Sequence, residues 1–115
     1  MSLEGAHVLT AERGELTTAE EMRAYLAALE HFVERAGVTS VLFDARNDGA
    51  PRAGDKATRD VRWDYLAKRT RITRSAVVAE SEIAQTRINM TARAHGVTLR
   101  AFLDHESAEK WLAEK

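Results

Sequence analysis

The sequence alternates between short apolar runs and longer segments in which apolar residues recur at helical spacing. The runs at residues 38–45 and 76–79 are apolar and partly β-branched, which is typical of strands covered on both faces in a parallel sheet. A weaker alternation at residues 6–12 predicts a first strand, and residues 97–104 form the last predicted strand. The central unit is a strand, a helix and a strand over residues 72–104. This pattern indicates an α/β protein.

Capping residues mark the ends of the predicted helices. Thr18 is followed three residues later by Glu21, which is the pattern of a capping box. A glycine at a helix end supplies the left-handed turn that stops the helix. The start signals are Thr18, Ser81 and Asp104, and the stop signals are Gly37 and Gly96. The first of these helices is one-sided, with its apolar residues within one arc of about 120°.

The helix predicted over residues 56–70 differs because its apolar positions form two stripes. Ala57, Val61 and Tyr65 lie on one side, and Trp63, Leu66 and Thr70 lie on nearly the opposite side. A helix on the sheet of a monomer buries one stripe, so we expect a homodimer in which a second copy covers the other. The interface candidates are Arg59, Arg62, Trp63 and Leu66.

These elements predict a single α/β domain over residues 1–115. We expect a single-layer, mostly parallel four-stranded sheet of order 2-1-3-4, with helices on both faces. This order creates a switch point between the first and third strands, where a ligand of an open α/β sheet binds. Residues 1–5 are expected to be flexible or vector-derived.

The composition excludes several classes of protein. A chain of 115 residues with 44% hydrophobic and 30% charged residues suits one compact domain. It contains no cysteine, which rules out disulfides and thiolate zinc sites. No stretch approaches the roughly 20 apolar residues that span a bilayer. We therefore expect a cytoplasmic protein.

Charge is distributed unevenly along the chain. Residues 1–51 carry four Lys/Arg against nine Asp/Glu, whereas residues 52–100 carry eleven against five. Two interpretations stay open: the asymmetry steers a partner, or acidic and basic helices neighbour each other on one surface. Acidic residues interrupt the basic segment and the pI is near 6.4, so we expect no nucleic-acid binding. Contact of the basic helix and its Trp63 with an anionic membrane is a minor interpretation.

Catalytic patterns are absent from the sequence. Neither Ser75 nor Ser81 lies in a G-x-S-x-G elbow, and no H-E-x-x-H or glycine-rich phosphate-binding pattern occurs. We expect no enzyme activity, no metal and no cofactor.

Arg87 departs from its surroundings, because it lies in the middle of a broad apolar arc on the predicted third helix. We expect its side chain to be more than half buried and paired with an acid or a bound anion near the carboxyl end of the sheet. A structural ion pair, a stem that reaches solvent and a ligand contact all stay open. The candidate ligand-binding or anion-binding residues are Arg87, Asp44, Glu80 and Ser81.

Four stretches between Arg13 and Leu112 carry a family resemblance. They are GELTTAEEMRAYLAALE, VTSVLFDAR, RSAVVAESEIAQTRI and VTLRAFLDHESAEKWL. These stretches resemble the SpoIIAA-like branch of the STAS superfamily, which comprises small bacterial STAS/SEC14-type proteins. The resemblance implies a non-enzymatic module, regulatory or interacting, that binds a protein partner or a small ligand. The alternative that it leaves open is a SEC14-like carrier of a lipid or other apolar ligand at a membrane surface.

The chain departs from that family's pattern in the loop after the second strand. STAS proteins that antagonise sigma-factor regulators present a phosphorylatable serine there, in a D-S-[ST]-G type sequence. Residues 46–56 contain no serine or threonine, and the nearest hydroxyl is that of Thr58. The resemblance therefore does not extend to phosphorylation at that loop.

Overall fold

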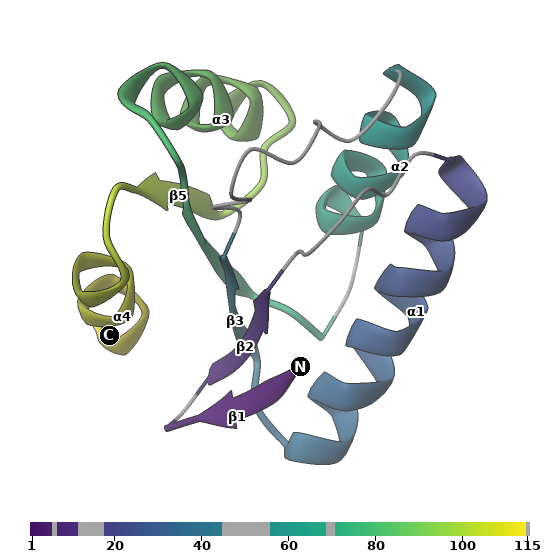
Figure 1. The fold of residues 1–115 in the computed structure, drawn as a ribbon. Coiled ribbons are helices and arrows are strands. Elements are labelled where there is room, and N and C mark those ends of the chain that lie inside the picture. Colours follow the sequence, from purple (N-terminus) through teal and green to yellow (C-terminus); the bar gives the residue numbers. More distant parts are fainter. Residues whose placement is uncertain (6, 12–17, 45–55, 69–70, 115) are drawn as a thin grey trace.

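The computed structural model describes residues 1–5, 7–11, 18–44, 56–68 and 71–114. In these ranges the chain forms one sheet and the helices that cover it (Figure 1). The elements, in chain order, are β1 (Ser2–Glu4), β2 (His7–Ala11), α1 (Ala19–Ala36), β3 (Ser40–Asp44), α2 (Lys56–Ala67), β4 (Arg74–Val78), α3 (Glu82–Ala94), β5 (Leu99–Phe102) and α4 (His105–Ala113).

The sheet has the consecutive order β1-β2-β3-β4-β5. β1 is antiparallel to β2, and the remaining neighbours are parallel. The α/β class is confirmed. The expected four-stranded order 2-1-3-4 is wrong, because the second expected strand, β3, lies between β2 and β4. Val41 of β3 pairs with Val8 of β2 on one side and with Ser75 of β4 on the other. The first five residues, expected to be flexible or vector-derived, include β1.

The consecutive order explains where the helices lie. Crossovers between parallel strands are right-handed, so a sheet that grows in one direction receives successive helices on one face. Residues of α1, α2 and α3 accordingly share one core with the sheet. The described strands therefore contain no switch point of the kind expected from the order 2-1-3-4.

Alternating strand residues supply two cores, one on each face of the sheet. Val41 and Phe43 pack with the buried face of α1, whereas Leu42 packs with α4 on the other side. Figure 1 shows α1 and α2 on one side of the sheet and α4 on the other. Helices on both faces, as expected, are therefore confirmed.

The predicted caps of the helices are present. Thr18 precedes α1 and its hydroxyl accepts the N–H of Glu21 at 3.0 Å. Gly37 ends α1 with a φ of 71°, a left-handed conformation that favours glycine. Asp104 caps α4 in the way that Thr18 caps α1, since its carboxylate accepts the N–H of Ser107 at 2.8 Å.

Described apolar side chains of both α2 stripes are covered within the chain, although Ala57 at the start of the helix is exposed. Val61 and Tyr65 pack against the core that α1 forms with the sheet. On the other side Leu66 is 9% exposed, and the indole of Trp63 stacks on His95 with the ring centroids 5.5 Å apart. Thr70 lies outside the described residues. The expectation that a monomer leaves the second stripe open is wrong, because α2 lies between α1 and the end of α3.

Candidate functional site

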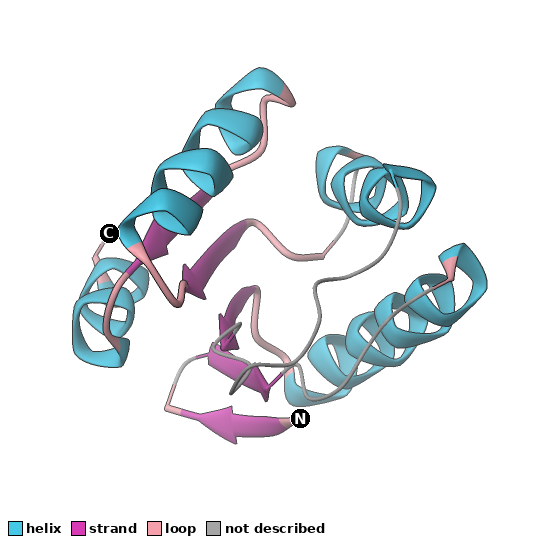
Figure 2. Cartoon of the chain, turned by 45° about the horizontal axis from the view of Figure 1, so that its top comes forward, coloured by secondary structure: helices cyan, strands magenta, loops and turns pink. Residues whose placement is uncertain are grey.

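The candidate site lies on α3, because this helix turns two of its polar side chains toward the sheet. The side-chain amide of Gln85 donates to the carbonyl of Ala101 at 3.2 Å, and the side-chain carbonyl of Asn89 accepts the N–H of Ala101 at 2.8 Å. These two bonds occupy the backbone of the edge strand β5, where open groups would otherwise invite pairing with another chain. Figure 2 shows α3 lying along β5.

The consequence of this setting is an apolar outer face on α3. Ile83 and Met90 are seven residues apart, two turns along one side of the helix. They are 73% and 64% exposed, more than the other exposed large hydrophobic residues of the described ranges. Arg87 lies between them, and Glu82, Thr86 and Thr91 complete the lining of a shallow hollow. We name the surface formed by Glu82, Ile83, Thr86, Arg87 and Met90 the α3 patch.

Arg87 is therefore exposed, and its expected burial is wrong. The sequence pattern predicts an apolar arc that faces the sheet, but the amide bonds to β5 turn part of that arc outward. The hollow that Arg87 lines includes neither Asp44 nor Glu80. Asp44 ends β3 and Glu80 is exposed after β4, while the hydroxyl of Ser81 caps α3 by accepting the N–H of Ala84 at 3.1 Å. The four candidates do not form one site in the described structure.

A comparison with protein families identifies this arrangement of sheet and helices. A model of the SpoIIAA-like family matches residues 8–113 of the 115. The chain belongs to the SpoIIAA-like family. No curated protein and no solved structure matches it. SpoIIAA-like domains are often regulatory protein-interaction modules and are generally non-enzymatic.

The α2 residues expected at an interface do not form an open surface in this SpoIIAA-like protein. Leu66 is buried, and the indole of Trp63 stacks on the ring of His95. Arg62 is half-buried and its guanidinium lies 3.7 Å from the sulfur of Met22 on α1, whereas Arg59 is exposed. The four residues therefore do not share one exposed surface, which weakens the case for α2 as a contact with a second copy or a membrane.

Metal binding and membrane insertion are two further functions to compare with the described residues of the SpoIIAA-like chain. No group of three or more His, Cys, Asp or Glu residues in the described ranges lies in a position to hold a metal ion. Within the same ranges, no helix combines the length and the apolar character needed to cross a bilayer. The loop at residues 45–55, where the family's regulators carry a serine, lies outside the described residues.

Proposed function

We propose that this SpoIIAA-like protein is a non-enzymatic interaction module and that the α3 patch is its protein-contact surface. The observation that carries the proposal is the exposure of Ile83 and Met90 on a helix whose opposite side is bonded to β5. Apolar residues that are clustered and exposed mark interaction sites on proteins. Arg87 between them adds a side chain of a type enriched in such contacts. The family's frequent role in protein interaction supports the same conclusion.

Within this proposal the partner is a second copy of the chain. An antiparallel contact about a two-fold axis would set Ile83 of one copy against Met90 of the other. In this register the two Arg87 side chains lie near the axis, and each would have to extend about one turn to reach Glu82 of the other copy. The patch is thus complementary to itself in its apolar residues. This contact replaces the α2 stripe as the proposed surface of the homodimer.

Light scattering on the wild type and on Ile83→Asp tests this proposal. We expect the wild type to have the mass of two chains at high micromolar concentration and Ile83→Asp to have the mass of one, because a carboxylate would be desolvated in the contact. Leu3→Asp is the matched control, since Leu3 is 51% exposed on β1. The control should remain dimeric. A wild-type mass of one chain, or a dimeric Ile83→Asp, would overturn the α3 contact.

The alternative, a SEC14-like carrier, needs an apolar cavity of roughly 300 Å³ or more between the helices and the sheet. Two hollows of that size in the described structure lie elsewhere. One is the α3 patch, and the other is a cleft of about 470 Å³ between α1 and α2. Charged side chains surround the cleft: Arg23, Glu30, Asp64 and Lys68. The α3 patch is apolar but shallow and exposed, and neither hollow lies between the helices and the sheet, which favours the interaction module.

A further inference from the structure

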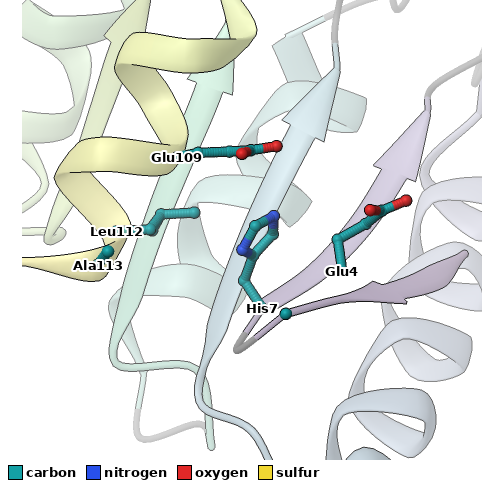
Figure 3. A pocket seen from close by; sticks show the side chains of 6 residues that line it. Glu4, His7, Glu109, Leu112 and Ala113 are labelled. Atoms are coloured by element: carbon teal, nitrogen blue, oxygen red, sulfur yellow. The ribbon is translucent and has the colours of Figure 1, made fainter.

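A cavity of about 280 Å³ lies between α4 and the hairpin of β1 and β2. Its lining combines two carboxylates, one imidazole and a small apolar surface (Figure 3). The lining residues are Glu4, Gly5, His7, Glu109, Leu112 and Ala113. His7 directly precedes Val8, whose side chain faces α1, so the imidazole points to the opposite face of the sheet. The cavity is therefore separate from the α3 patch, and a ligand bound in it would be independent of the proposed function.

His7 is the unusual member of this lining. The residue is 9% exposed, and its Nε2 is buried without a hydrogen-bond partner among the described residues. A buried polar atom of this kind destabilises the fold when nothing satisfies it. The carboxylates of Glu4 and Glu109 line the same cavity without bonding to this nitrogen, and Figure 3 shows the ring between them. The cavity thus contains an unused hydrogen-bonding group.

The charges around His7 restrict the ligand that would use it. Burial lowers the pKa of His7 below its usual 6.5, against the opposing effect of Glu109, so the ring is neutral at pH 7. A neutral ring flanked by two carboxylates disfavours an anion and favours a cation that donates N–H bonds. The same three residues are not placed to hold a metal ion. Leu112 and Ala113 offer the apolar contact that a short alkyl chain requires.

We propose that the cavity binds a small primary alkylammonium ion. Its ammonium group would lie between Glu4 and Glu109 and donate one hydrogen bond to Nε2 of His7. Its alkyl chain would contact Leu112. Because Nε2 is buried in the wall of the cavity, the imidazole would turn slightly toward the cavity to accept this bond. The carboxylate of Glu109 also contacts His105 one turn earlier on α4, which holds it at the wall.

Titration of the full chain with n-butylamine tests the proposal, with the imidazole signals of His7 followed by NMR. We expect saturable binding of n-butylamine and none of n-butanol, which has the same length without the charge. Glu109→Gln should weaken binding by about tenfold or more, because a charge-assisted hydrogen bond is lost. Glu106→Gln is the matched control on the same helix, since Glu106 does not line the cavity. Equal affinities in the two variants would overturn the site.

His7→Phe separates a binding role from a structural one. Phenylalanine retains a ring in the cavity and removes the unsatisfied nitrogen, so the melting temperature should stay equal or rise while butylamine binding is lost. A lower melting temperature with unchanged binding would assign His7 a structural role and refute the proposal. Should this variant fail to fold, Glu109→Gln still decides the question. Binding should also decline on acidification, because a protonated His7, which faces Glu4 on β1 and Glu109 and His105 on α4, no longer offers Nε2 as an acceptor.

Discussion

Tyr65 shows how a single side chain fixes two helices. Its hydroxyl donates a hydrogen bond to the carboxylate of Glu30, which joins α2 to α1. The other oxygen of Glu30 accepts the backbone N–H of Arg71 at 3.3 Å, and the guanidinium of Arg71 lies 3.4 Å from the carboxylate of Glu34. One acid of α1 thus holds the helix and the segment that leads to β4.

Replacing Tyr65 tests this connection. Tyr65→Phe should lower the free energy of unfolding by about 1.5 kcal/mol, the lower end of the range for a hydrogen bond to a charged group, because this bond is only partly buried. Urea denaturation at pH 7 measures the loss. Tyr25→Phe, which removes a bond of 2.9 Å to the uncharged hydroxyl of Thr10, is the control at a second tyrosine. A cost no greater than that of the control would show that the charge of Glu30 adds nothing.

The same residue predicts a dependence on pH. Burial, and then the hydrogen bond to Glu30, raises the pKa of the Tyr65 phenol above its usual 10.0. The fold therefore favours the neutral phenol. Its contribution is complete below the unfolded pKa and is lost as the pH rises toward the higher folded value. The difference in unfolding free energy between wild type and Tyr65→Phe should shrink above pH 10. A constant difference across this range would contradict the assignment.

At the scale of elements, α3 combines two tasks through its two faces. Gln85 and Asn89 close the backbone of β5, and the apolar residues left outside form the α3 patch. An ordinary amphipathic helix would turn its apolar side inward. The inner face of α3 is mixed, since Ile88 and Ala92 pack inward beside the two amides. The amides are accommodated because the helix covers an edge strand, whose backbone offers hydrogen bonds that a central strand does not.

Asn89→Ala tests the edge contact. It would leave the N–H of Ala101 without its acceptor, and Ala101 is 1% exposed. We expect a loss of about 1–3 kcal/mol in thermal or urea denaturation, the cost of a buried unsatisfied donor. Asn89→Asp keeps an acceptor at this position and should retain most of the stability. Thr86→Ala, on the exposed side of α3, should change little. Equal effects at positions 86 and 89 would contradict the role assigned to Asn89.

At the scale of the molecule, the position of α2 between α1 and α3 changes the meaning of Trp63. The indole contributes to the packing of one chain through its stack on His95. Trp63→Glu should therefore lower the melting temperature without changing the mass of the folded protein in light scattering. Trp63→Phe keeps a ring for the stack and should be the milder change. A monomeric Trp63→Glu with unaltered stability would restore α2 as the dimer interface.

The sequence determined the features that depend on residues close together in the chain. The helix starts at Thr18, Ser81 and Asp104 were predictable because each cap bonds to an N–H three residues away. The parallel strands followed from short apolar runs, and the family followed from the stretches that contain them. The proposed interaction module rests on this family membership and on the exposed residues of the α3 patch.

The tertiary structure alone decided the features that join distant residues. Strand order depends on the direction in which each crossover continues, which a hydrophobic pattern does not encode. The rotation of α3 depends on amide bonds from Gln85 and Asn89 to Ala101, and these outweighed the burial expected for the arc around Arg87. The cavity exists because α4, the last helix, brings Glu109 beside His7 near the start of the chain. Local periodicity carries no information about such pairs, since their contact is fixed only when the sheet and helices pack.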